Sequence, residues 1–149
     1  MIRRYGKAPN GDQRYRVRHG AYAVVLRGRS VLLTWQGGIH DEMQLPGGGI
    51  DPGESVLRAL HREVYEETGW HIAAPRRLGT YRRFTWMPEY QRHAEKVCHI
   101  YLARPTLRMG PPTEPDHSAN WMDLDQAVSR LDNTGDAAFA AGVVRWLSL

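Results

Sequence analysis

Two short runs of apolar and β-branched residues stand close together near the start of the chain, at 21–26 and 31–35. The four residues between them, 27–30, are turn-prone, so the pattern predicts a β-hairpin. The segment that follows, 36–52, is rich in glycine and also contains two prolines. Because this composition disfavours regular helix and lets the backbone approach a ligand closely, we predict a loop with strand fragments there.

A helix is the clearest prediction in the middle of the chain. Residues 54–68 contain neither glycine nor proline, and Gly69 follows at the position where a helix commonly ends. The remaining pattern predicts strands at 76–86 and 96–103, a proline-punctuated loop at 105–117, a short strand at 119–122 and helices at 123–131 and 136–147. Strands interleaved with helices indicate a mixed α/β domain.

Length and composition indicate an ordinary globular domain. The 149 residues are 42% hydrophobic and 24% charged, so we expect a single domain over 1–149. No window approaches the roughly 18 to 20 apolar residues of a membrane span, and the first twenty residues have no apolar block typical of a signal peptide. With Cys98 as the only cysteine, no intrachain disulfide can form. We therefore expect a cytoplasmic protein without membrane association.

Basic residues outnumber acidic ones, 20 against 16, and all of them except Lys7 and Lys96 are arginine. The guanidinium group fits phosphate oxygens well, which makes a polyanionic ligand worth considering. Arginine in place of lysine on a solvated surface is the simpler interpretation. The arginines are also scattered along the sequence, whereas a nucleic-acid-binding stripe would be clustered, so nucleic acid is not an expected partner.

Three glutamates share one face of the predicted helix. Glu63, Glu66 and Glu67 are spaced i, i+3 and i+4, beside an apolar stripe of Leu57, Leu60 and Val64. Like charges at these spacings repel, and Mg²⁺ prefers such hard oxygen ligands. Arg62 could reach Glu66 at i+4. Taken alone, three glutamates on a helix are more often a solvated face.

The wider spacing changes this interpretation. Gly48, five residues, Glu54, seven residues, and then the run REVYEETGW from Arg62 to Trp70 resemble the Nudix box, the defining motif of the Nudix hydrolase superfamily. The flanking hairpin, strands and C-terminal helix also resemble a Nudix domain, so the resemblance covers most of the chain. Trp70 stands where the family more often has an aliphatic residue, but it remains apolar.

The resemblance implies an α/β/α sandwich with a mixed β-sheet, and hydrolysis of a nucleoside diphosphate linked to another group. It also implies a divalent metal, Mg²⁺ with Mn²⁺ as a substitute, held by Glu63, Glu66, Glu67 and the carbonyl of Gly48. The metal ions would neutralise charge that develops on the phosphoanhydride oxygens.

By the same resemblance the candidate catalytic residues include Arg62, which would orient the carboxylates, Glu66 and Glu54. Glu54 lies nine residues before Glu63, so on a continuous helix it cannot share the stripe unless it sits at or before the first turn. It is either a carboxylate that assists a water or the metal, or only a favourable charge at the helix N-terminus.

Candidate residues outside the box come from two segments. Trp86 or Tyr90 could stack on a nucleobase, which is worth roughly 1 to 3 kcal/mol per base, although Trp86 would also suit a strand core. The loop 105–117 is long for a plain connection. Its Glu114 is the candidate for a further acidic ligand or the general base, with His117 as the alternative; a solvated loop is about equally compatible with the sequence.

The leading functional hypothesis is a metal-dependent pyrophosphohydrolase that acts on a small nucleotide derivative. Alternatives are an RNA 5′-end pyrophosphohydrolase, a non-catalytic nucleotide-binding or regulatory module, and, more remotely, a diphosphate isomerase with a catalytic cysteine. The complete set of box glutamates argues against the non-catalytic module. A homodimer stays open.

Overall fold

The predicted hairpin is present at the centre of the structure, a computed structural model that describes residues 1–149. Strand β2 (Arg16–Arg27) pairs antiparallel with β3 (Ser30–Gln36), and Arg27 lies opposite Ser30 at the turn. Gly28 has a φ of +61° there, a conformation that glycine adopts without the strain a side chain would add. The sequence prediction of a hairpin is confirmed.

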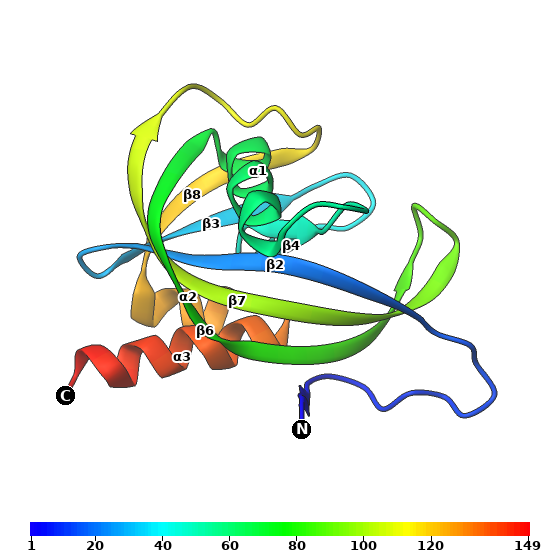
Figure 1. Cartoon of the computed structure of the whole chain (residues 1–149). Helices are drawn as coiled ribbons and strands as arrows, with labels where there is room; N and C mark the ends of the chain where they lie inside the picture. The colour runs from blue at the N-terminus through cyan, green and yellow to red at the C-terminus, as the bar shows by residue number, and fades with distance from the viewer.

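All eight strands belong to one mixed sheet, whose main path runs β1-β6-β7-β2-β3-β4. Strand β5 pairs with β2, and β8 pairs with β3. Strands β2 and β7 run parallel, as do β1 and β6, while the other pairs are antiparallel (Figure 1). The remaining strands are β1 (Arg3–Arg4), β4 (Glu42–Gln44), β5 (Gly47–Gly49), β6 (Trp70–Met87), β7 (Arg92–Arg108) and β8 (His117–Asp123).

Helices cover both faces of this sheet. Helix α1 (Val56–Thr68) packs on one face, while α2 (Leu124–Arg130) and α3 (Thr134–Leu147) pack on the other (Figure 1). Strand β2 serves both layers because its buried residues alternate: Ala23 and Val25 face α1, and Val24 faces the other two helices. The expected α/β/α sandwich with a mixed sheet is therefore confirmed.

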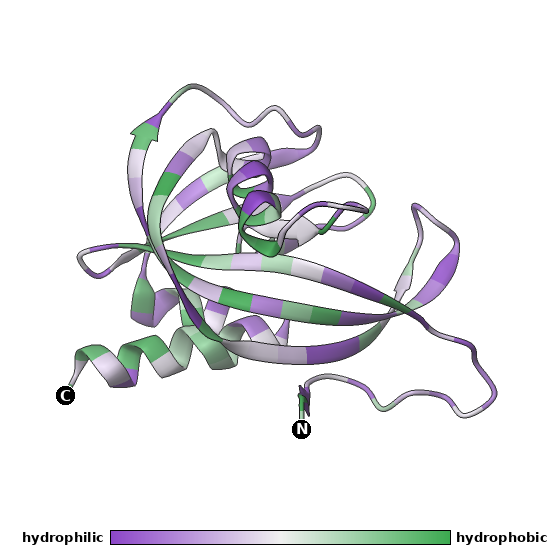
Figure 2. Ribbon diagram, in the orientation of Figure 1, coloured by the Kyte–Doolittle hydropathy of each residue, from purple (hydrophilic) through white to green (hydrophobic).

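The hydropathy pattern separates the two ends of β2. Its second half and α3 are largely apolar, whereas its first half and the outward surface of α1 are hydrophilic (Figure 2). The exposed start of β2 comprises Arg16 to His19, which continue to pair with β7. The sheet therefore extends beyond the core that it helps to form, and polar groups line this extension.

The strands predicted for β6 and β7 are too short at the ends that carry prolines. The first expected strand begins at residue 76 and the second ends at residue 103. The observed pairing extends beyond both, to Trp70 and Arg108, through several register shifts. Strand β2 stops pairing with β7 at Ala103, so Pro105 lies on a stretch that pairs only with β6. A missing backbone N–H is tolerated at such an edge. The predicted loop 105–117 is consequently shorter, 109–116.

The C-terminal region agrees with the prediction within two residues. Asp123 caps α2, although its side chain accepts from the backbone N–H of Asp125 rather than from that of Gln126. Helix α3 begins at Thr134, two residues earlier than predicted, because Asn133 caps it. None of the three helices has the length and apolar character needed to cross a membrane.

Candidate active site

Helix α1 places the three glutamates at the edge of its buried face. The Ser55 hydroxyl caps the N-terminus by accepting from the backbone N–H of Arg58, so the helix starts at Val56 and not at the predicted residue 54, and Glu54 lies before it. Leu60 and Val64 are fully buried against the sheet. Leu57, predicted to share this stripe, is instead 44% exposed, and packing of Leu60 and Val64 turns Glu63 and Glu67 toward the glycine-rich strand β5.

Arg62 connects four parts of the site. Its guanidinium donates two hydrogen bonds to Glu54, of 2.7 and 2.8 Å. It also donates to Glu63 at 3.0 Å, to Glu66 at 3.2 Å and to the carbonyl of Gly49 at 3.1 Å. The predicted i+4 contact with Glu66 is present, and the bidentate pair with Glu54 is an addition that helix periodicity could not indicate. Arg62 thus links the residues before α1 to its carboxylate stripe.

As the pH is lowered, we expect the stability of Glu54→Gln to fall less steeply than that of wild type. The hydrogen bonds from Arg62 lower the pKa of Glu54 from 4.5 to about 2. A carboxyl group with a lowered pKa contributes stability above its unfolded-state value and loses it as the pH falls through about 2. Urea unfolding midpoints measured from pH 5 down to pH 2 should therefore decline more steeply for wild type than for the variant. Parallel plots of the urea midpoint against pH for the two proteins would show that the pair of Arg62 and Glu54 contributes nothing to stability.

Strand β5 brings backbone close to two of the glutamates. The backbone N–H of Gly47 donates to Glu67 at 3.0 Å. At Gly48 an added Cβ would lie 2.5 Å from Oε2 of Glu63, so only glycine lets this carboxylate approach the strand. The triple glycine is one of the strand fragments predicted for 36–52, held against residues 20–22 of β2 by antiparallel pairing.

Burial shifts the pKa of two glutamates upward. Desolvation raises the pKa of Glu63 to about 7, although the charge of Arg62 acts in the opposite direction. Desolvation likewise raises the pKa of Glu67, whose side chain is only 8% exposed. The charges of Glu66 and Glu114 add to both increases. A positive charge placed among these carboxylates would relieve that repulsion.

The donor set fits a hard divalent cation. In the structure no three His, Cys, Asp or Glu side chains converge on one point at ligand distance. Glu63 and Glu66 are instead paired with Arg62, and Glu67 with Gly47. Desolvated carboxylates beside a backbone that admits only glycine offer the oxygen ligands that Mg²⁺, Mn²⁺ or Ca²⁺ prefer.

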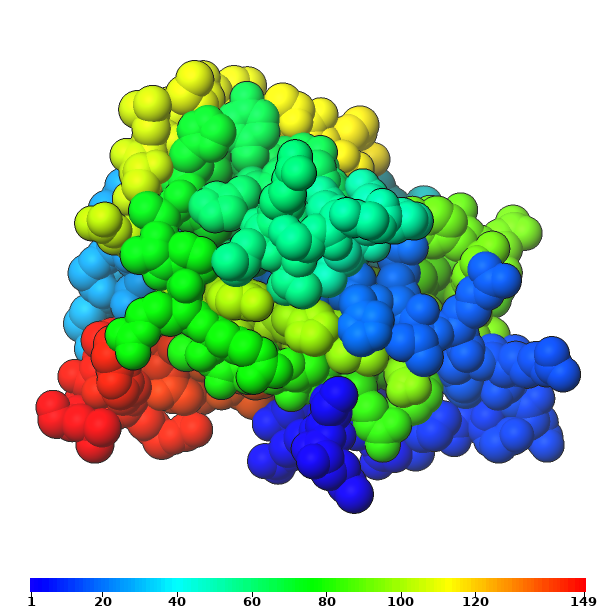
Figure 3. Space-filling view, in the orientation of Figure 1, coloured from blue at the N-terminus to red at the C-terminus, as the bar shows by residue number.

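The two candidates from the predicted loop both lie beside the stripe, Glu114 in the observed loop 109–116 and His117 as the first residue of β8. The backbone N–H groups of Thr113 and Glu114 donate to the carbonyl of Glu66, which anchors this loop to α1. The Glu114 side chain is exposed, whereas the His117 side chain is 3% exposed, with Nε2 3.6 Å from Oε2 of Glu67. Burial lowers the pKa of His117, which favours the neutral ring. Figure 3 shows the loop (yellow) lying against the green surface of α1.

A polar cavity of about 180 Å³ begins at the glycine strand and extends toward the start of α3. Glu67 and Gly48 line one end of it, and Trp86 and Tyr90 lie at its wall, where both side chains are about half exposed. Both predicted stacking residues therefore belong to the same cavity as the box. The guanidinium of Arg18 lies over the Tyr90 ring, 5.1 Å from its centroid.

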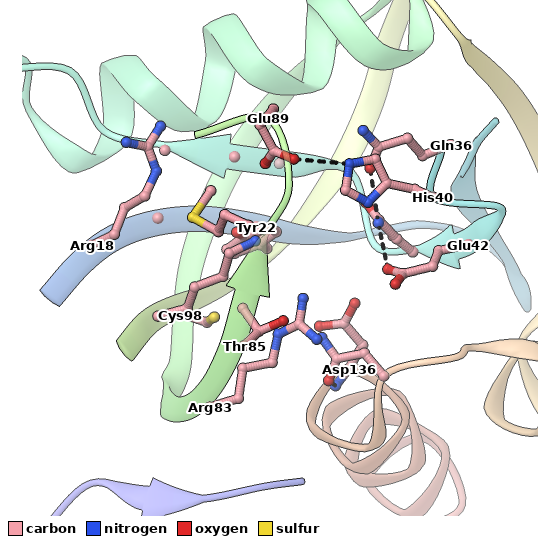
Figure 4. A pocket seen from close by; sticks show the side chains of 18 of the residues that line it. Arg18, Tyr22, Gln36, His40, Glu42, Arg83, Thr85, Glu89, Cys98 and Asp136 are labelled. Atoms are coloured by element: carbon pink, nitrogen blue, oxygen red, sulfur yellow. Dashed lines mark hydrogen bonds and ion pairs between the residues drawn. The ribbon is translucent and has the colours of Figure 1, made fainter. Parts of the chain in front are cut away.

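Several residues of this cavity were missed by sequence reasoning. Figure 4 shows Arg18 at one end and Arg83 beside Asp136 at the other, and it marks the pair of His40 and Glu89 in the cavity lining. The arginines are scattered along the sequence, but strand pairing places Arg18 and Arg83 on either side of Lys96. A signal was present: Lys96 shares the alternate inward positions of β7 with Ala94, Cys98 and Ile100, which are buried and apolar.

Comparison with known proteins agrees with this arrangement. The family model described as the NUDIX domain matches residues 17–147. A Bacillus subtilis protein provisionally named 8-oxo-dGTP diphosphatase is 38% identical over 72 residues, which cover 48% of this chain and 46% of that protein. The CMP-5′-(N-acetyl-N-hydroxy-3-aminopropyl)phosphonate hydrolase of Streptomyces rubellomurinus is 34% identical over 110 residues, 71% of this chain and 50% of that protein. The chain thus spans about half the length of these curated relatives.

Solved structures resemble the fold as a whole. The crystal structure of a MutT NUDIX hydrolase from Burkholderia pseudomallei superposes with a TM-score of 0.60 at 27% identity, and covers 74% of this chain and 85% of that one. A MutT protein from Methanosarcina mazei superposes with a TM-score of 0.69 at 17% identity, over 91% of this chain and 98% of that one. The second likeness concerns the fold alone.

Proposed function

The chain belongs to the NUDIX domain family, and on that premise we propose that it is a divalent-metal-dependent hydrolase of a phosphoanhydride bond in a nucleoside diphosphate linked to another group. One observation carries the proposal. The glutamate stripe of α1 is complete, and one of its members, Glu67, lines the cavity together with Gly48. The relatives named above are a diphosphatase and a hydrolase of a CMP derivative, which supports this reaction class.

Mg²⁺ is the proposed metal, with Mn²⁺ as a substitute. Glu63, Glu66, Glu67 and the Gly48 carbonyl would hold it, since they supply only hard oxygen ligands. When bound, such an ion stabilises charge on the diphosphate oxygens and lowers the pKa of a coordinated water.

The role proposed for Arg62 and Glu54 is to orient the stripe. Glu54 holds the Arg62 guanidinium by two hydrogen bonds, which leaves a single nitrogen to contact both Glu63 and Glu66. This arrangement keeps the two carboxylates close together despite their repulsion. A bidentate pair is geometrically specific, so lysine would not replace Arg62.

Glu114 is the proposed proton acceptor. It is exposed to solvent, and its charge is close enough to raise the pKa of Glu63 and of Glu67. His117 is less suitable because its ring is buried, with Nδ1 2.8 Å from the Thr34 hydroxyl and Nε2 directed at Glu67. At 3.6 Å, Nε2 contacts the Glu67 carboxylate without a hydrogen bond, so the ring packs against Glu67 and is shielded from solvent.

Replacing Trp86 or Tyr90 by alanine is expected to raise KM about tenfold and change kcat little. A stacking contact made equally in the ground and transition states contributes to binding alone. Loss of one stack is worth roughly 1 to 3 kcal/mol. Steady-state kinetics on a nucleotide substrate would measure this, with Trp146→Ala as control, because Trp146 is similarly exposed but lies on α3 outside this cavity. Unchanged KM in both variants would show that neither Trp86 nor Tyr90 contacts the substrate.

A substrate panel tests the proposed function directly. The protein, purified with EDTA, is incubated with Mg²⁺ or Mn²⁺ and nucleoside triphosphates, dinucleoside polyphosphates, nucleoside diphosphate sugars or triphosphorylated RNA. We expect metal-dependent release of a nucleoside monophosphate from at least one small nucleotide. The products are identified by chromatography. Cleavage of RNA alone would support the RNA 5′-end alternative. No cleavage with either metal would contradict the proposal.

A further inference from the structure

Three basic residues form a row across adjacent strands on the floor of the cavity. Arg18 of β2 lies opposite Lys96 of β7, and Lys96 lies opposite Arg83 of β6. All three line the cavity, so their side chains share one face of the sheet. We call these residues the cationic row. It leads from the box end, where the Arg18 guanidinium lies against Gly49, to the end near α3.

Such a row lowers stability unless something compensates its charge. Like charges directly opposite each other in a sheet are destabilising, and burial increases the effect. Neither Lys96 nor Arg83 takes part in any ion pair of the structure. The Nε of Arg83 is buried without a hydrogen-bond partner. Burial and the charge of Arg83 both lower the pKa of Lys96.

The acids of the cavity are engaged elsewhere. Asp136 accepts from the Tyr81 hydroxyl at 2.7 Å and from the backbone N–H of Leu45 at 3.2 Å. Glu89 pairs with His40 at 3.1 Å, and Glu42 accepts from the Gln44 side chain. The charge of Asp136 still attracts Lys96 and Arg83, but neither cation has a carboxylate within ion-pair distance, so the two neighbouring cations have no direct partner in the cavity.

We propose that Lys96 and Arg83 bind a phosphoryl group of the substrate, additional to the two joined by the cleaved anhydride. This inference rests on the proposed function, and it narrows the substrate class to nucleotide derivatives that carry a further phosphate. A phosphoryl group supplies the negative charge and the oxygen acceptors that both cations lack. A neutral base edge would satisfy the hydrogen bonds but would leave the repulsion between the two charges.

Binding of inorganic phosphate tests the subsite without any turnover. Metal-free wild-type protein is titrated with phosphate at constant ionic strength, and its melting temperature gives the apparent Kd. In Lys96→Met we expect phosphate binding at least tenfold weaker. Lys7→Met is the matched control, because Lys7 is the only other lysine and is exposed outside this cavity. It should bind phosphate as wild type does.

Two further measurements distinguish a phosphate-binding role of Lys96 from a purely structural role. Lys96→Arg should restore most of the phosphate affinity, since it keeps the charge. Without phosphate, Lys96→Met should melt at or above the wild-type temperature, because it removes the repulsion of Arg83. A lower melting temperature would show that Lys96 stabilises the fold. Lys96 is the primary test site because Arg83 is the more constrained side chain, with a fully buried Nε.

Equal phosphate affinity in wild type and Lys96→Met would overturn the proposal. Tighter binding of guanosine than of phosphate, also lost in Lys96→Met, would overturn it in favour of base recognition. Neither result depends on hydrolysis. Lys96-dependent phosphate binding without cleavage of any panel substrate would contradict the proposed function alone, and cleavage without such binding would contradict this inference alone.

Discussion

Replacement of Glu67 by glutamine is expected to lower kcat at least 100-fold at saturating Mg²⁺ while the fold stays intact. Such a loss corresponds to about 2.7 kcal/mol of transition-state stabilisation, which is reasonable for removing one charged metal ligand. The fold should persist because the glutamine carbonyl can still accept from the backbone N–H of Gly47, 3.0 Å away in wild type. The variant also removes a carboxyl group whose pKa burial raises, so unfolding should require at least as much urea as wild type.

Glu95→Gln is the matched control for this prediction. Glu95 lies on β7 with 21% of its side chain exposed and pairs only with Arg82, at 3.6 Å. It lies outside the cavity and the box, so its kcat should stay within about twofold of wild type. Near-wild-type turnover in Glu67→Gln at saturating metal would show that the stripe is not a metal site.

The largest effect on stability is expected for Gly69→Ala, at about 3 kcal/mol. Gly69 ends α1 with a φ of +78°, which costs a residue with a side chain about 1 to 2 kcal/mol. The added Cβ would also overlap the carbonyl of Gly110, so the loop 109–116 would have to move. Chemical denaturation should show a correspondingly lower free energy of unfolding.

Gly53→Ala separates the two contributions, because Gly53 has the same φ of +78° but no atom within 4 Å of an added Cβ. It should cost only about 1 kcal/mol. The same loop carries Glu114, so Gly69→Ala should also reduce kcat in the protein that remains folded, whereas Gly53→Ala should leave kcat unchanged. Equal destabilisation by the two variants would show that the Gly110 carbonyl moves away from the added Cβ at no cost. The loop 109–116 would then not be held in place at Gly69.

The helix and its glutamates followed from local sequence rules. Spacing of i, i+3 and i+4 places side chains on one face whatever the rest of the chain does, and Gly69 marks the end of the helix by its tolerance of positive φ. The hairpin was predictable for the same reason, since alternation and a short turn are local properties. The ends of β6 and β7 were not, because register shifts and an open strand edge accommodate Pro105.

Contacts of the candidate loop were predictable only in part. Its position just before the last strand indicated Glu114 and His117, and both lie beside the stripe. Their environments differ, with one side chain exposed and the other nearly fully buried against Glu67. Burial depends on how the loop docks on α1, so sequence alone could not show which residue is free to accept a proton.

The sequence by itself determined the order of the elements, the face of α1 that carries Glu63, Glu66 and Glu67, and the family to which the chain belongs. Only the tertiary structure brought Lys96 between Arg18 and Arg83. Arg18 is far from Lys96 along the chain, and Arg83 faces Lys96 across the β6–β7 hairpin, so their meeting depends on the register of β2, β7 and β6. A shift of one residue in either pairing would turn a side chain to the opposite face of the sheet, so long-range strand pairing decides what lines the cavity.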